Sequence, residues 1–369
     1  MNELDKFLAD LKKRLPEHLR EKLLQPHAAD ELVKELPSLF PPARLATEAE
    51  DRRTWELAGL LYLNLGRHHD AIAIFNSMLK QMYTHQDNTS TFVHKGVPLV
   101  WIADCYQALG YRALAKRFLM HTLCEDAIAC EGRLNPLDIG AYHRLVWQFG
   151  LPHKMIQDYA VKMAGFASKK SEYKLFPEAI LLELDSDWQT EIPTAQEVTQ
   201  FVSNTFYIRH LMRQLGDGTG TALERLAHYL MSCIPGIRVA RRKKSFSSDY
   251  DLVCAVDGSD VDFRSELGRY FVCECKDWNH SANFTSFAKF CRVLDSVKAR
   301  FGVIFSKNGI SGDAHTTDAV REQLKVFQDR GLIIVALDEG DLEALAEGKS
   351  LIAILRHKYE VIRLDLRPS

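Results

Sequence analysis

The segment Tyr270–Lys276, with the sequence YFVCECK, decides how the C-terminal part of this chain folds. Aromatic and β-branched residues favour an extended strand, and residues two apart in a strand share one face. Glu274 and Lys276 therefore project together, with their Cα atoms roughly 6–7 Å apart. A carboxylate and an ammonium on an otherwise apolar strand are costly to bury unless they pair or bind an ion. The segment predicts a strand over residues 270–275, with Glu274 and the following Lys276 as candidate functional residues.

The residues around this strand alternate between strand-like and helical patterns. The sequence predicts helices over residues 221–234, 284–299, 314–329 and from 341 onward, and further strands over 237–240, 252–256, 302–305 and 332–337. The order α-β-β-β-α-β-α-β is typical of an α/β layer fold with a central mixed sheet. Upstream, the stretch 198–215 predicts another amphipathic helix, followed by a Gly-rich segment, Gly216–Gly220, that is typical of an interdomain linker.

Two acidic residues precede the strand predicted over 252–256, in the segment SSDYDLV. Asp249 and Asp251 share a face, and Asp251 is the first candidate for a metal ligand, with Asp249 as the fallback. Two carboxylates bind Mg²⁺ through hard oxygen atoms, and the metal polarises a phosphoryl oxygen and activates water. A lysine beside that water can orient or deprotonate it and favours the negatively charged transition state. Asp251, Glu274 and Lys276 are thus the set that phosphodiester hydrolysis needs; the alternatives are an ion pair at the surface and a turn at the strand start.

These residues, in this order of elements, resemble the PD-(D/E)xK restriction-endonuclease superfamily, and most closely its type IV, Mrr-like branch. The resemblance covers residues 216–345, and it implies a nuclease that acts on DNA in defence against foreign DNA. In this chain Asp251 is followed by Leu, with no Pro before it, so only its position identifies it as the ligand. The matching motifs are ALERLA from Ala222, DLV from Asp251, ECKDW from Glu274, FAKF from Phe287 and GVIFSKNGISG from Gly302.

The resemblance also assigns roles to individual residues. It implies that Asp251 and Glu274 ligate Mg²⁺, or Mn²⁺ in its place, together with the backbone carbonyl of Cys275, and that Lys276 acts on the water. In this superfamily an acid on the first helix often joins the metal site, and here that acid is Glu224. The sequence Thr221-Ala-Leu-Glu224 is equally a capping box, in which Glu224 would only bind the helix start.

Positive charge is local in this sequence. The formal net charge is −2, so no global basic field indicates nucleic-acid binding. Lys307 lies in the Gly-rich turn predicted over 306–312, where it and the backbone could contact phosphates; an ordinary strand-to-helix turn is the alternative. The densest basic cluster precedes the acidic segment and begins at Arg238. Its other members are expected to contact phosphates: Arg241, Arg242, Lys243 and Lys244.

Residues 1–200 have helical periodicity and contain a degenerate repeat. The first copy has WELAGLLY at 55–62 followed by Gly66, the second has WIADCY at 101–106 followed by Gly110, and a weaker third ends near Gly150. In each copy a small residue lets helices approach, an aromatic residue fills the groove, and the glycine ends the first helix of a pair. The pattern resembles the tetratricopeptide repeat with a spacing longer than the usual ~34 residues. A helical bundle without repeats is the alternative.

Length and composition indicate a globular chain of more than one domain. It has 369 residues, 46% hydrophobic and 26% charged. The absence of an apolar run of about 18 residues, the charged N-terminus and eight cysteines without a CxxC pair predict a cytoplasmic protein with no membrane span. The expected domains are an N-terminal helical segment (1–45), tetratricopeptide-like repeats (46–167), a helical connector (168–215), the restriction-endonuclease-like domain (216–345) and a C-terminal extension (346–369).

The sequence therefore predicts an all-helical repeat domain followed by a restriction-endonuclease-like α/β domain with a central mixed sheet. We expect a Mg²⁺-dependent endonuclease whose helical repeats bind a protein partner or a second copy of the chain, as in a homodimer. DNA is the favoured substrate, and an RNA nuclease is one alternative. The other alternative is a catalytically inactive nucleic-acid-binding or scaffold protein built on a nuclease fold.

Overall fold

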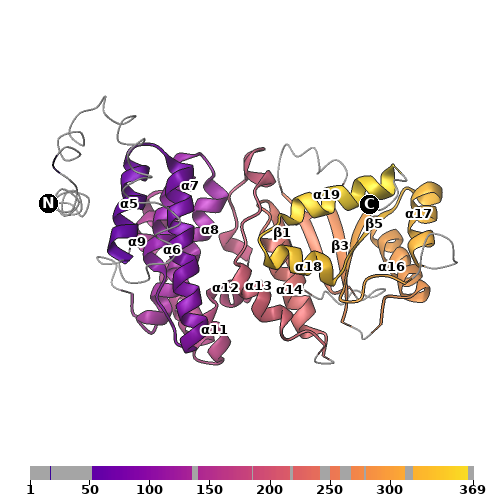
Figure 1. The fold of residues 1–369 in the computed structure, drawn as a ribbon, viewed down its shortest axis with the longest axis horizontal. Helices are drawn as coiled ribbons and strands as arrows, with labels where there is room; N and C mark the ends of the chain where they lie inside the picture. The colour runs from indigo at the N-terminus through magenta and orange to yellow at the C-terminus, as the bar shows by residue number, and fades with distance from the viewer. Residues whose placement is uncertain are drawn as a thin grey trace. The chain divides into compact units, whose positions relative to one another are not determined.

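The computed structural model describes residue 17 and residues 52–134, 140–184, 186–216, 219–241, 250–257, 267–277, 280–311 and 319–364. The described residues form helices and one five-stranded mixed sheet, and the chain divides after Glu183 into two compact units (Figure 1). No helix in the described ranges combines the length and the apolar character needed to cross a membrane. The expected helical segment 1–45, apart from Glu17, lies outside the described residues.

The N-terminal unit is helical. Consecutive helices pack on each other from α5 to α9, and the first helix of each pair, α5, α7 or α9, is followed by a glycine with positive φ: Gly66, Gly110 or Gly150. The glycines therefore end these helices as the sequence predicted. The helices are α5 (Arg52–Asn64), α6 (His68–Thr89), α7 (Gly96–Ala108), α8 (Arg112–Ala129), α9 (Gly140–Trp147), α10 (His153–Ala167), α11 (Ser171–Leu175) and α12 (Pro177–Leu181).

The first two pairs share one capping pattern. The Arg67 N–H donates to the Tyr62 carbonyl over 2.9 Å, and the Tyr111 N–H donates to the Tyr106 carbonyl over 2.8 Å. This bond spans the left-handed glycine and satisfies a carbonyl that the helix end leaves open. The small residue of the first copy, Ala58 in α5, is fully buried, as the close approach of two helices requires.

The C-terminal unit contains the sheet. Its helical elements are the 3₁₀ turns η1 (Ser186–Trp188) and η2 (Glu197–Thr199), then α13 (Thr205–Met212), α14 (Thr221–Ser232), α16 (Phe284–Val297), α17 (Ala319–Arg330), α18 (Glu339–Ala346) and α19 (Leu351–Arg363). Its strands are β1 (Ile237–Arg241), β2 (Leu252–Val256), β3 (Tyr270–Lys276), β4 (Phe301–Ser306) and β5 (Ile333–Leu337).

The strands lie in chain order, β1-β2-β3-β4-β5. The pairs β1–β2 and β2–β3 are antiparallel, whereas β3–β4 and β4–β5 are parallel, so the sheet is mixed as predicted. In this topology β2 begins at the end of the sheet where the parallel strands β3, β4 and β5 finish. We call this end of the sheet, along the strand direction, the edge. Side chains at the start of β2 and at the ends of the parallel strands are thereby brought to one place.

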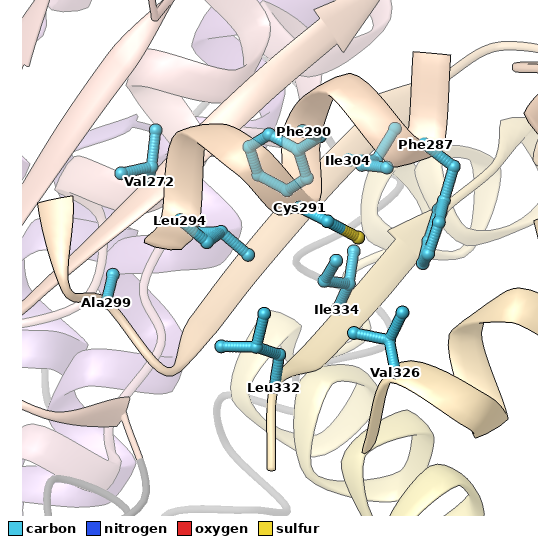
Figure 2. Packing of buried hydrophobic residues seen from close by; sticks show 10 residues of the cluster. All are labelled: Val272, Phe287, Phe290, Cys291, Leu294, Ala299, Ile304, Val326, Leu332 and Ile334. Atoms are coloured by element: carbon cyan, nitrogen blue, oxygen red, sulfur yellow. The ribbon is translucent and has the colours of Figure 1, made fainter. Parts of the chain in front are cut away.

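Helices cover both faces of the sheet. Figure 2 shows the core under α16, where Phe287, Phe290 and Leu294 face apolar residues of the strands. On the other face Phe271 packs edge-on against Phe301 at 5.5 Å between ring centroids, and Phe301 packs against Tyr359 of α19. Because α19 covers this face, residues 351–363 form part of the core layer, where the sequence predicted only a terminal extension.

Residues 184–215 also differ from the expected connector. The helix predicted over 198–215 is shorter in the structure, because it begins only after Asn204. Asn204 is the N-cap, and its Oδ1 accepts from the Phe206 and Tyr207 N–H groups. The resulting α13 packs against α14 within the C-terminal unit, with the Tyr207 and Tyr229 rings 4.9 Å apart. The boundary after Glu183 therefore precedes the Gly-rich segment that the sequence suggested as the linker.

This difference predicts which fragment of the chain folds. A fragment Leu184–Ser369 should unfold cooperatively, because it keeps the fully buried Tyr207, Ile208 and Leu211 of α13. A fragment that starts at Gly216 should be less stable, since burial of each such side chain contributes about 2 kcal/mol. Circular dichroism melting of both fragments measures the difference. Equal stability would show that α13 does not belong to this unit.

Candidate functional site

The predicted site residues lie at the edge of the sheet where β2 begins and β3 ends. Leu252 pairs with Cys273 in the antiparallel register, so Asp251 comes opposite Glu274 one step further along. Opposite residues of an antiparallel pair share a face. On the other side of β3, Lys276 pairs in register with Ser306 at the end of β4. The fold thus brings together two segments that are distant in the sequence.

Asp251 has a defined role in the backbone. Its Oδ2 accepts a hydrogen bond from the Cys275 N–H over 2.8 Å. The carboxylate thereby takes the place of the next bond of the β2–β3 ladder and ends the pairing of the two strands. The same bond places the Asp251 carboxylate next to the backbone between Glu274 and Lys276. Asp251 is the residue that the sequence predicted as a metal ligand.

Glu274 and Lys276 form an ion pair, in which Lys276 Nζ contacts Glu274 Oε1. The two side chains are only 18% and 21% exposed, respectively. Burial raises the pKa of Glu274 above its ordinary value, and the negative charge of Asp251 raises it further. Lys276 lowers the same pKa through its hydrogen bond and its charge, and Glu224 adds a smaller raising effect. Lys276 therefore favours the ionised form of a carboxylate that its surroundings tend to protonate.

Glu224 lies in the first turn of α14, close enough to act on the same groups. The helix is capped by Gly220, with φ +69°, and no side chain caps it. The alternative of a capping box between Thr221 and Glu224 is therefore wrong, because the helix starts one residue earlier than that motif requires. Instead, Glu224 acts on the Cys275 thiol. Burial raises the pKa of this thiol most, and the negative charges of Asp251, Glu224 and Glu274 raise it further, in that order. The positive charge of Lys276 lowers it.

The turn after β4 lies at the same edge and is held by several hydrogen bonds. Ser306 Oγ donates to the Gly309 carbonyl over 2.8 Å, and Gly309 has a positive φ. The Ala282 N–H donates to the Gly309 carbonyl, which joins the segment before α16 to this turn. Lys307 is partly exposed, and its Nζ lies 3.9 Å from Glu339 Oε1 at the start of α18. Its charge thus lies at the edge that carries Lys276, where it faces Glu339.

Of the basic residues expected to contact phosphates, only the first, Arg241, can be placed. The backbone of Arg241 pairs with Leu252, so β1 ends beside the start of β2 and at the same edge. The three following basic residues, Arg242, Lys243 and Lys244, lie outside the described part of the chain. Asp249, and Trp278 of the ECKDW motif, lie outside it too.

Asp277 is a residue of this edge to which the sequence analysis gave no role. Its Oδ2 accepts from the Gly216 N–H over 2.9 Å, and its Oδ1 is buried with no hydrogen-bond partner among the described residues. The only signal in the sequence was its position directly after Lys276. Its partner lies in a segment that the sequence assigned to a linker, so no local pattern could reveal the contact.

The donor set has two carboxylates that suit a hard divalent cation, Asp251 and Glu274, with Glu224 adding negative charge nearby. Three carboxylates thus raise the pKa of the Cys275 thiol, whereas only the ammonium of Lys276 lowers it. A bound divalent cation would offset this excess of negative charge. In the described ranges of the chain, no three His, Cys, Asp or Glu side chains are arranged to hold a metal ion by themselves. A cation here would therefore need the backbone carbonyl, water or substrate oxygens as further ligands.

Comparison of the chain with protein-family models, with curated proteins and with solved structures found no match. The geometry of the edge formed by β2, β3 and β4 is therefore the basis on which a function is proposed.

Proposed function

We propose that this protein is a metal-dependent endonuclease that hydrolyses phosphodiester bonds at the edge formed by β2 and β3. The observation that supports it is the placement of two acids, Asp251 directly before β2 and Glu274 in β3, beside Lys276 in a partly buried position. Burial and like charge both oppose ionisation of Glu274, and such perturbed groups are concentrated at functional sites. The resemblance of the sequence to the PD-(D/E)xK superfamily also supports this proposal.

The metal would be held by Asp251, Glu274 and the carbonyl of Cys275. When bound, Mg²⁺ supplies polarisation of a phosphoryl oxygen and a lower pKa of its water. Glu224, from α14, contributes negative charge that favours cation binding at the same place. The residues fit this role because ionised carboxylates are the ligands that Mg²⁺ prefers.

Lys276 carries the remaining chemistry in this proposal. Its ammonium lowers the pKa of Glu274, against the raising effect of burial, and can donate hydrogen bonds to the attacking water or to a phosphate oxygen. As negative charge grows on the phosphoryl oxygens, a fixed positive charge stabilises the transition state more than the ground state. Lys307 and the backbone of the turn after β4 lie at the same edge and would bind neighbouring phosphates.

The helical unit gives the proposal its second part. Its successive helix pairs with left-handed glycine caps support a tetratricopeptide-like arrangement, whose grooves would bind a protein partner or a second copy of the chain. We propose DNA as the substrate and defence against foreign DNA as the role, both on the strength of the sequence resemblance. RNA is the alternative substrate.

Metal dependence is the first test of this function. Purified protein should cut supercoiled plasmid in Mg²⁺ or Mn²⁺ and stop when EDTA is added, because Asp251 and Glu274 act through a cation in this mechanism. Single-stranded DNA and RNA, incubated in parallel, decide the substrate class. Glu274→Gln should lose both the cleavage and the response to Mg²⁺. Full cleavage in EDTA would contradict the mechanism.

A specific observation favours one other function. Lys276 is paired with Glu274, and Asp251 is bonded to the Cys275 N–H, so these polar groups also serve the sheet itself. They would do the same in a non-cleaving nucleic-acid-binding protein on this fold. The plasmid experiment distinguishes the two functions, since such a protein would retard the plasmid in a gel and leave it intact in every metal.

A further inference from the structure

Phe284 is an exposed aromatic residue at the start of the helix that covers one face of the sheet. It is the first residue of α16, and it is 45% exposed. The preceding Asn283 caps the helix, because its Oδ1 accepts from the Ser286 N–H over 3.0 Å. The cap holds the first turn in a helical conformation, so the position of Phe284 on α16 is defined.

The spacing along α16 places Phe284 on the stripe of side chains that faces the sheet. Phe287, Cys291 and Leu294 of this stripe are buried in the core cluster. Residues three and four apart share a helix face, so Phe284, three residues before Phe287, belongs to the same stripe. Figure 2 shows Phe287 at one end of the cluster and Leu294 toward the other. Phe284 therefore continues the stripe by one turn, about 5 Å, beyond the buried core.

The proposed site lies on the same face of the sheet. Val272 of β3 belongs to the core cluster, and alternate residues of a strand share a face, so Glu274 and Lys276 project on the side that α16 covers. Because α16 leads from the end of β3 to the start of β4, it begins at the edge and runs away from it. Toward the edge, the core thus gives way to Glu274 and Lys276 on the strand and to Phe284 on the helix.

A hydrogen bond joins the start of α16 to the turn after β4. The Ala282 N–H, two residues before Phe284, donates to the Gly309 carbonyl over 2.8 Å. Lys307 lies in this turn, and its side chain is 33% exposed. In the proposed function Lys307 and Lys276 bind phosphate oxygens, so Phe284 begins its helix next to the place where the phosphate of a nucleotide would lie.

The surroundings of Phe284 suit a nucleic-acid base. Single exposed apolar side chains are common on proteins, and what distinguishes this one is its place. Its neighbours Asn283 and Thr285 are polar and exposed, so the ring does not form the contiguous apolar patch through which proteins dock on each other. A base stacks on a single aromatic ring, and the phosphates beside it need positive charge nearby. One ring close to two lysines provides both.

We infer that Phe284 binds the substrate by stacking on a base next to the phosphate that is cut. The inference rests on the proposed function and narrows the substrate class to single-stranded or locally unpaired nucleic acid. In an intact duplex both faces of a base are covered by its neighbours, and the base must leave the stack before a side chain can cover it. Stacking tolerates every base, so Phe284 should confer no sequence preference.

Two oligonucleotides of equal length separate contacts to bases from contacts to the backbone. One consists of deoxyadenosines, and the other has the same phosphates and abasic sugars. In EDTA, where the proposed site cannot cut, Phe284→Leu should weaken binding of the first about tenfold, the usual loss for one base–aromatic stack, and leave binding of the second unchanged. Phe284→Trp should retain both affinities. An equal loss on the two oligonucleotides, no loss on either, or no binding of the deoxyadenosine oligonucleotide by the unmodified protein would overturn the inference.

The chain offers two matched controls. Tyr270→Leu removes a 51% exposed aromatic ring at the other end of β3, and Val297→Ala shortens a 39% exposed side chain at the other end of α16. Both should bind the two oligonucleotides as the unmodified protein does. Phe284→Leu should also unfold at nearly the same temperature, because the ring lies beyond the core. A clear fall in its melting temperature with unchanged binding would show that the ring serves only the fold.

Cleavage rates then connect the ring to the reaction. With Mg²⁺, the unmodified protein should cut a single-stranded oligonucleotide faster than the same sequence in a fully paired linear duplex, and Phe284→Leu should lose about tenfold on the single strand. A duplex that is cut faster than the single strand would contradict the inference. If the unmodified protein cuts neither, the proposed nuclease function fails, whereas the two binding isotherms still decide whether Phe284 stacks on bases.

Discussion

Lys276→Ala is expected to lower the rate of phosphodiester cleavage by about 10³-fold, within the range typical of a lost proton-transfer or charge-stabilising group. Affinity for nucleic acid should change by less than about threefold, because the proposed interaction of Lys276 strengthens only as the transition state forms. The ammonium is partly buried beside Glu274, so its charge is less screened than that of a surface lysine. Single-turnover rates and a filter-binding isotherm measure the two quantities separately.

The pH profile of this variant separates two roles of Lys276. Lys276 lowers the pKa of Glu274, so its removal lets that pKa rise further. Glu274 then keeps its proton to a higher pH, and metal binding is weakened below that pKa. If Lys276 served only to ionise Glu274, raising the pH would restore cleavage, because Glu274 would lose its proton without help. We expect no recovery, since the charge is also needed in the transition state.

A surface lysine provides the control for this variant. Lys349→Ala removes an exposed lysine after α18 and should leave both rate and affinity unchanged. Cleavage by Lys276→Ala at the rate of the unmodified protein would show that the Glu274–Lys276 pair serves only the sheet. Recovery at high pH would instead assign Lys276 to the ionisation of Glu274.

Lys95→Met should destabilise the helical unit by about 3–5 kcal/mol, the usual cost of removing one partner of a buried ion pair. The side chains of Lys95 and Glu125 are both 0% exposed, and Lys95 Nζ lies 3.0 Å from Glu125 Oε1. The same ammonium donates to Gln86 Oε1 over 2.9 Å and to the Val93 carbonyl over 2.6 Å. Its loss would leave the buried Glu125 carboxylate without its opposite charge and would remove the hydrogen bonds to Gln86 and Val93.

The cost of this variant should depend on pH. Burial raises the pKa of Glu125, and Lys95 lowers it, so removing Lys95 raises it further. An acid whose folded pKa is raised binds its proton more tightly when folded, which favours the folded state below its unfolded pKa. That contribution is lost as the pH rises through the folded pKa. Lys95→Met should therefore be less destabilised near pH 5 than near pH 8.

Urea unfolding of three variants at both pH values tests this expectation. Lys95→Met and Glu125→Gln should each be destabilised, and Lys95→Met combined with Glu125→Leu should recover most of the loss, because no buried charge remains. Arg67→Met, which breaks the exposed pair with Asp70, should change stability by less than about 1 kcal/mol. A cost that small for Lys95→Met would contradict the burial of the pair.

The sequence by itself determined where the main elements lie. The strand predicted over 252–256 is β2, and the strand predicted from Tyr270 is β3 with one more residue, Lys276. The helix predicted from Phe284 is α16, which ends two residues earlier than expected. Gly66, Gly110 and Gly150 also end their helices as predicted. Side-chain alternation, apolar periodicity and glycine conformation act over a few neighbouring residues, so a local pattern is enough to find them.

The tertiary structure alone decided which of these elements meet. It placed Asp251 on the Cys275 N–H and bonded the Gly216 N–H to Asp277. It decided against the capping box, one of two alternatives for Glu224, because the helix is capped at Gly220. It also assigned α13 and α19 to the sheet-containing unit, although the sequence suggested a connector and an extension. Each of these contacts joins residues or elements whose pairing depends on the order of the strands and the packing of helices on the sheet. Local periodicity carries no information about such partners, because the free energy of the contact arises only when the whole layer is assembled.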